Sequence, residues 1–90
     1  MSLLPISGPL TVGTVGGQLD LGQHLVEGLV VDLAQVEAVD SAAVSLLLAW
    51  LRQAQHRSLN ISFDHIPENL LSLARLYGVV EFLPLRQGNA

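Results

Sequence analysis

The 90-residue sequence contains no cysteine and no lysine, and each absence excludes a class of chemistry. Without cysteine there is no disulfide bond, no thiolate nucleophile and no thiolate metal ligand, so nothing ties the chain to an oxidising compartment. Without lysine there is no phosphate-binding loop of the P-loop type, which ends in Gly-Lys-Ser or Gly-Lys-Thr. The glycines do not match a GxGxxG loop either. Nucleotide hydrolysis by a P-loop is therefore excluded.

Charged residues are also scarce, at 13% of the chain against about 25% in an average protein, whereas hydrophobic residues make up 50%. The formal net charge of −4 argues against binding to a nucleic-acid backbone, which requires clustered basic side chains. A domain of this size cannot hide so much apolar surface in its interior. We therefore expect an apolar contact surface for a partner.

Features that direct a chain to or across a membrane are missing from the sequence. The first ten residues, MSLLPISGPL, lack the basic start and the apolar run of a signal peptide. The longest apolar segment, residues 42–51, is far shorter than the roughly 20 residues that span a bilayer. We therefore expect a cytoplasmic domain without direct membrane insertion.

The length and the alternation of strand and helix patterns predict one α/β (α+β) domain over residues 1–90, with its core in residues 3–84 and a polar tail in residues 85–90. Strands are expected at residues 3–7, 29–33, 59–63 and 79–83. Helices are expected from Asp40 or Ser41 to about residue 57, and from Pro67 to Gly78. The buried stripe of the second helix is expected to consist of Leu70, Leu73, Ala74 and Tyr77.

The segment between the first two expected strands gives an ambiguous pattern. Val12, Val15 and Leu19 keep helical spacing, but each of several interleaved glycines costs about 1 kcal/mol in a helix interior. The residues alone therefore leave helix and loop both open here.

No catalytic constellation emerges from the polar residues. His24, His56 and His65 have no ligand-like spacing, so we expect no metal site. No pair of carboxylates is placed for acid–base catalysis, and no nucleophile can be recognised from spacing. We expect no cofactor and no enzymatic activity.

Asp40 and Ser41 stand where the chain enters the central helix. Either side chain can cap the helix by accepting a hydrogen bond from an unpaired backbone N–H group. Alternatively, Ser41 can serve as a phosphorylation or partner-docking hydroxyl, because a phosphate at this point meets the positive end of the helix dipole. Both interpretations remain open from the residues alone.

A helical wheel at about 100° per residue gives the central helix two apolar sides. Val44, Leu47, Leu48 and Leu51 share the side that is expected to face the core. Leu46 and Trp50 lie on the other side and have the character of a binding hot spot, rather than of singly exposed hydrophobes. The predicted partner interface consists of Asp40, Ser41, Ala42, Ser45, Leu46, Ala49, Trp50, Gln53 and Arg57.

Two stretches, VVDLAQVEAVDSAAVSLLLAWLR and LNISFDHIPENLLSLARLYGVVEFLP, resemble STAS domains, the family of sulfate-transporter tails and anti-sigma factor antagonists. Within the family, LLLAWLR and LARLYGVVEFLP are most similar to the STAS subunits of Mla phospholipid-transport ABC complexes. The resemblance implies a mixed sheet of about four strands and a first helix from residue 12 to about 23. Family members usually carry glycine after Asp-Ser/Thr, where this chain has Ala42 and Ala43. The N-terminus is short, so the first family strand is expected to be truncated or absent.

The resemblance implies a non-catalytic subunit that docks on an ABC-transporter ATPase of the MlaF type and contacts a membrane permease indirectly. It implies a cytoplasmic, peripheral position at the inner membrane, two copies per complex and a possible homodimer. The alternative is an anti-sigma factor antagonist that is controlled by phosphorylation of Ser41.

Overall fold

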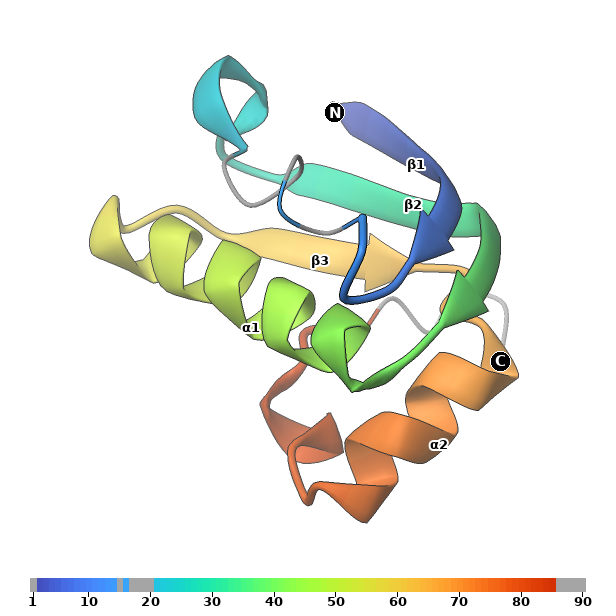
Figure 1. The fold of residues 1–90 in the computed structure, drawn as a ribbon. Coiled ribbons are helices and arrows are strands. Elements are labelled where there is room, and N and C mark those ends of the chain that lie inside the picture. The colour runs from blue at the N-terminus through green and yellow to red at the C-terminus, as the bar shows by residue number, and fades with distance from the viewer. Residues whose placement is uncertain (1, 15, 17–20, 86–90) are drawn as a thin grey trace.

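The computed structural model describes residues 2–14, 16 and 21–85. Figure 1 shows a small sheet with helices packed against it. The elements in chain order are β1 (Leu3–Leu10), the 3-10 helix η2 (Gly22–His24), β2 (Leu29–Val39), α1 (Ser41–His56), β3 (Ile61–Asp64), α2 (Glu68–Leu76) and the 3-10 helix η3 (Val80–Phe82).

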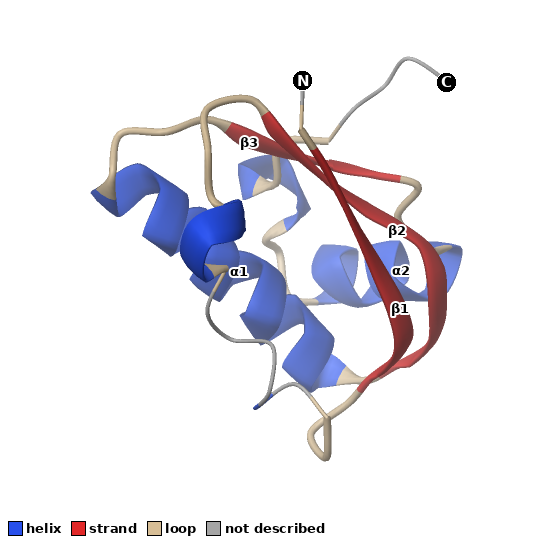
Figure 2. Ribbon diagram, turned by 90° about the horizontal axis from the view of Figure 1, so that it is seen from above, coloured by secondary structure: helices blue, strands red, loops and turns tan. Residues whose placement is uncertain are grey.

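The three strands form a parallel sheet in the order β1-β2-β3. The register places Leu3 beside Val30, and Leu29 beside Ile61. Parallel neighbours need crossover connections, and right-handed crossovers in a constant direction put those connections on one side of the sheet. Figure 2 shows the helices together on that side. The α/β class is confirmed, although the described strands are all parallel and not mixed.

Alternating side chains of the strands build the core between the sheet and the helices. Ile6 and Leu10 of β1 and Ile61 and Phe63 of β3 are buried, whereas the residues between them are exposed or half-buried. This alternation follows from the period of two in a strand. From the helical side, Leu70 and Ala74 of α2 join the same cluster, together with six residues of α1.

The expected strand at residues 79–83 is not present, and the sheet has three strands where about four were predicted. Residues 80–82 form η3 instead. The position beside β3 is taken by the next residues, where the Phe63 N–H donates to the Pro84 carbonyl at 2.9 Å and Phe63 pairs with Leu85 in an isolated parallel bridge. Pro84 has no N–H group for a ladder, so the pairing does not extend into a strand.

The first helix that the family resemblance implied, from residue 12 to about 23, is not found in the described part of that segment. Thr14 closes a turn onto Thr11, with N–H to carbonyl at 2.9 Å, and residues 22–24 form the single turn η2. Gly22 has a φ of 56°, a left-handed conformation that a right-handed helix cannot continue through. Residues 15 and 17–20 lie outside the described residues.

Helix α1 buries more of its surface than the helical wheel predicted. Leu46 and Trp50, predicted to be exposed, are each 1% exposed and belong to the core, whereas Leu48 and Leu51 are only half-buried. The reason is that the chain before β2 covers the second apolar side, since Leu21 and Leu25 are buried in the same cluster. The Leu21 N–H donates to Gln53 Oε1 at 3.0 Å and fixes this cover to α1. The predicted hot spot at Leu46 and Trp50 is therefore wrong.

Replacing Trp50 with alanine should lower the free energy of unfolding by about 3–5 kcal/mol, because it removes the largest fully buried side chain. The exposed Gln55 on the same helix is the matched control, and Gln55→Ala should change stability by no more than about 0.5 kcal/mol. Urea melts of both variants measure the difference. Equal midpoints for the two would place Trp50 outside the core.

Candidate functional site

The carboxylate of Asp40 decides how the start of α1 is built. Asp40 is the N-cap, and its Oδ1 accepts a hydrogen bond from the Ala42 N–H at 2.8 Å. Its Oδ2 accepts a second bond from the Val12 N–H at 3.0 Å, while its own N–H donates to the Leu10 carbonyl at 3.3 Å. One side chain thus caps the helix and holds the turn after β1 beside it.

Because Asp40 caps the helix, the hydroxyl of Ser41 is not used for that purpose. Ser41 is the first residue of α1 and is exposed. Within the described part of the chain, its hydroxyl makes no hydrogen bond. The two interpretations of the Asp-Ser pair are therefore divided between two residues: Asp40 is the cap, and Ser41 offers a free hydroxyl at the positive end of the helix dipole.

A shallow groove of about 400 Å³ opens beside Ser41 and is hereafter called the Ser41 groove. Three segments that are far apart in the sequence form its walls: the turn after β1, the first half of α1 and the chain after α2. Val12 and Tyr77 stand at the groove with 81% and 52% of their surface exposed. The residues that line it are Val12, Ser41, Ala42, Val44, Ser45, Leu48, Tyr77 and Val79.

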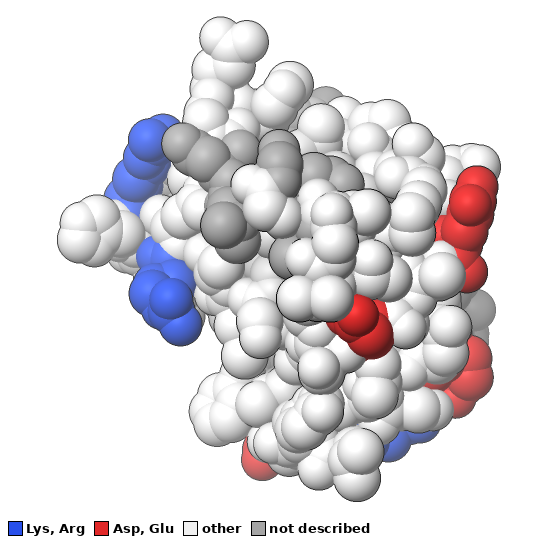
Figure 3. Space-filling model, viewed as in Figure 1, with Lys and Arg blue, Asp and Glu red and all other residues white. Residues whose placement is uncertain are grey.

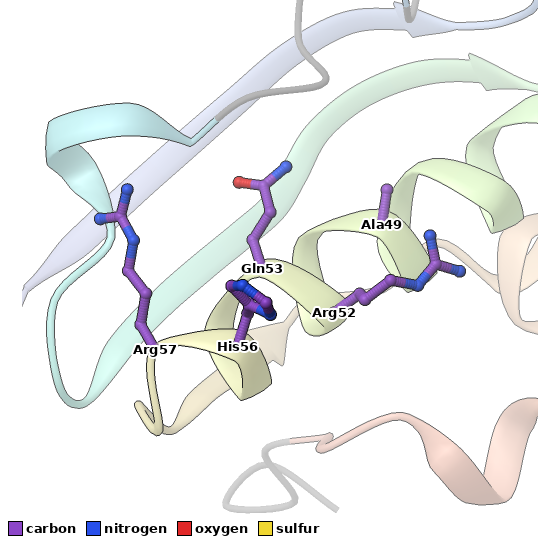
Figure 4. A pocket seen from close by; sticks show the side chains of 5 residues that line it. All are labelled: Ala49, Arg52, Gln53, His56 and Arg57. Carbon is purple, nitrogen blue, oxygen red and sulfur yellow. The ribbon is translucent and has the colours of Figure 1, made fainter.

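A second shallow hollow, of about 390 Å³, lies toward the other end of α1 (Figure 4) and is hereafter called the basic hollow. Its described lining residues are Ala49, Arg52, Gln53, His56 and Arg57. Figure 3 shows that the face of the molecule carrying α1 is mostly uncharged, and that the larger patches of arginine atoms lie at its left edge. Helix α1 therefore presents a neutral groove near its start and a basic hollow near its end.

The residues predicted for the interface are divided among three environments. Ser41, Ala42 and Ser45 line the Ser41 groove, with Asp40 holding its edge. Ala49, Gln53 and Arg57 line the basic hollow. Leu46 and Trp50 are in the core, as described above.

Five groove residues lie outside the predicted interface: Val12, Val44, Leu48, Tyr77 and Val79. Val44 and Leu48 were expected on the core side of the helix. Tyr77 was assigned to the buried stripe of α2, but it lies after the last residue of that helix and is about half exposed. Its position directly before Gly78, whose φ is 72°, is the signal that could have placed it at a helix end. Val12 and Val79 come to the groove only through the tertiary fold.

Polar contacts elsewhere on the surface do not form a comparable site. His65 Nδ1 lies 3.1 Å from Asp32 Oδ1 and 3.8 Å from Asp64 Oδ2. Among the described residues, no group of three His, Cys, Asp or Glu side chains could hold a metal ion.

The exposed carboxyl of Glu27 binds the chain before β3. The Asn60 side-chain amide and the Asn60 N–H donate to Glu27 at 3.0 Å each, and these bonds lower the pKa of Glu27 below its ordinary value. A lowered pKa means that the contact stabilises the fold at neutral pH and loses its effect as the pH falls through the pKa range of the carboxyl. The contact joins the turn before β2 to the chain before β3.

Comparison with known proteins identifies the family. A family model described as "Mlab, STAS domain" matches residues 3–85. The chain belongs to the STAS domain family, which confirms the resemblance seen in the sequence. No curated protein matches the sequence.

Among solved structures, the fold is similar to that of a sulfate transporter family protein from Wolinella succinogenes, with a TM-score of 0.73 and 17% identity over 93% of this chain and 74% of that one. At this identity, the likeness concerns the fold alone. No helix in the described part of the chain is long and apolar enough to cross a membrane.

Replacing Asp40 with alanine should lower the free energy of unfolding by about 0.5–2 kcal/mol, because both the cap and the bond to the Val12 N–H are lost. Ser41→Ala is the matched control and should be nearly neutral, since Ser41 is exposed and does not cap. Thermal or urea unfolding tests both. A larger loss for Ser41→Ala than for Asp40→Ala would exchange the two roles.

Proposed function

We propose that this chain is a non-catalytic STAS subunit that docks, through the Ser41 groove, on the ATPase of an Mla-type phospholipid-transport ABC complex. In such a complex it would support assembly or activity from the cytoplasmic face of the inner membrane and reach the permease only through the ATPase. The proposal includes two copies of this subunit in each complex. The observation that carries it is the exposed hydroxyl of Ser41 at the edge of an apolar groove.

The chemistry of the groove supports a protein partner over a small ligand. The groove is shallow and has apolar walls, with the hydroxyls of Ser41 and Ser45 at its exposed edge. Tyr77 adds an exposed aromatic ring, and tyrosine is among the residues that most often dominate binding energy at protein interfaces. Ala42 lines the groove and leaves a short side chain beside Ser41, whereas Ala43 is fully buried and offers no contact surface.

Family membership supports the same class of function. STAS domains generally are protein-interaction modules without catalytic activity, and the family model that matches this chain carries the Mlab description. The residues provide no set of groups placed for catalysis within the described chain, so the proposal includes no reaction. A possible homodimer would use surface outside the Ser41 groove if the groove is occupied by the ATPase.

An anti-sigma factor antagonist remains the second candidate because of one observation. Ser41 is exposed, is not required for capping, and lies at a helix N-terminus, where a phosphate group would be stabilised by backbone N–H groups. Purification of the tagged chain from its native host distinguishes the two. Recovery of an ABC ATPase and permease supports the transport complex, and recovery of a serine kinase or anti-sigma factor supports the alternative.

Ser41→Asp should abolish binding to the ATPase while leaving the fold near its native stability. A carboxylate buried in the contact without a partner costs several kcal/mol, whereas an exposed Asp in the first helical turn suits the dipole. Ser41→Thr keeps the hydroxyl and should bind. Ser7→Asp is the control, because it puts the same charge at an exposed position of β1. Titration with the purified ATPase measures binding, and undiminished affinity of Ser41→Asp would remove Ser41 from the interface.

Tyr77→Ala should weaken binding to the same ATPase by about 2 kcal/mol, which corresponds to roughly thirtyfold in Kd. Phe82→Ala is the matched control, because Phe82 is a comparably exposed aromatic residue, at 64%, that does not line the groove. Both variants should unfold near the wild-type midpoint. A stronger effect of Phe82→Ala would move the interface to the outer side of η3.

A further inference from the structure

The basic hollow gathers an unusual share of the positive charge of this protein. The chain has only four arginines, no lysine and a net charge of −4, yet two of the arginines, Arg52 and Arg57, line one hollow. On the face shown in Figure 3, the larger blue patches lie at the left edge away from the red atoms, and a smaller blue patch lies beside red atoms at the lower right. Such an arrangement gives an acidic protein one local region that attracts anions.

Neither of these two arginines is neutralised by the described part of its own chain. Arg75 lies 3.5 Å from Glu68, so the third described arginine has a carboxylate partner. No carboxylate of the described residues comes within 4.0 Å of Arg52 or Arg57. Both side chains are exposed, and Figure 4 shows their guanidinium groups on either side of Gln53 and His56.

Stabilisation of the helix end explains only part of this arrangement. Cations near a helix C-terminus offset the helix dipole, but the effect falls off within the last turn. Arg57 is the C-cap, whereas Arg52 lies more than one turn before it. Ala49 leaves space beside Arg52, and Gln53 is held through its bond from the Leu21 N–H. The hollow is therefore a formed surface with two separate guanidinium groups at its edges.

We infer that the basic hollow binds a carboxylate-bearing segment of the same ATPase that occupies the Ser41 groove, an inference that rests on the proposed function. The planar guanidinium of arginine binds carboxylates in a bidentate manner, which fixes orientation as well as charge. The two hollows lie on one helix, and its 16 residues span about 24 Å at about 1.5 Å per residue. One partner surface of standard size can cover both.

An anionic membrane surface fits the hollow less well than an acidic protein segment. Recognition of anionic lipids generally uses clusters of about 4–8 basic residues. The basic hollow offers two arginines and His56, and the chain has no lysine to extend it. Two arginines at fixed positions are better suited to a few carboxylates of a protein segment than to a lipid surface.

The test compares the ATPase affinity of wild type with that of the double variant Arg52→Gln and Arg57→Gln. We expect Kd to rise about tenfold or more, because close charge pairs at interfaces show large coupling energies. Raising the ionic strength from about 0.1 M to about 1 M, which shortens the Debye length from about 10 Å to about 3 Å, should weaken wild-type binding and affect the double variant much less. Arg75→Gln is the charge-matched control and should bind as wild type does.

The outcomes separate this inference from the proposed function. If wild type binds the ATPase and the double variant binds equally well at both ionic strengths, the inference fails and the proposed function stands. If wild type does not bind, both fail. The double variant must also unfold at the wild-type midpoint, and an Arg52→Lys, Arg57→Lys variant should recover part of the affinity. Binding to phosphatidylglycerol vesicles that the double variant loses, with ATPase affinity unchanged, would overturn the inference in favour of a lipid surface.

Discussion

The two oxygens of the Asp40 carboxylate fix the relation on which the candidate site depends. Oδ1 caps α1 and Oδ2 holds the N–H of Val12, so the helix start and the turn after β1 are bound to one side chain. This clamp places Val12 across from Ser41 and leaves the serine hydroxyl free. Asparagine offers only one acceptor oxygen at this position, so a full clamp of this kind requires a carboxylate.

Helix α1 is rich in apolar residues mainly because most of them are buried inside the domain. Leu46 and Trp50 are covered by the chain that precedes β2, with Gln53 binding the backbone at Leu21. The most apolar side of the helix is therefore buried, and the exposed surface lies elsewhere. It is a neutral groove between α1, the turn after β1 and the chain after α2, whose exposed apolar residues come from three separate segments.

The sequence predicted the features that depend on local interactions and missed those that depend on contacts between distant residues. The buried run of β2 and the alternation in β3 depend on neighbouring residues, and both were predicted. The helix cap was narrowed to Asp40 or Ser41, and the structure assigns it to Asp40. The wheel placed Val44 and Leu47 correctly in the core but not Leu46, Leu48, Trp50 and Leu51. It could not show that the chain at Leu21 and Leu25 covers the second apolar side, because that contact joins residues more than twenty positions apart. The short apolar run at 79–83 fits a strand or a helical turn equally, and only pairing of Phe63 with Leu85 decides between them.

The two hollows on α1 would contribute differently to one binding event. Apolar contact around Tyr77 and Ser41 acts at short range and mainly prolongs the bound state, since affinity differences at one interface lie mostly in the dissociation rate. The arginines at the other end act at longer range, and charge complementarity raises the association rate and fixes orientation more than it raises affinity. If α1 is the binding helix, the positive charge at one end of it would give this acidic domain a preferred direction of approach to its partner. In the proposed complex, the one helix that carries both features would couple orientation at Arg57 to placement of Ser41.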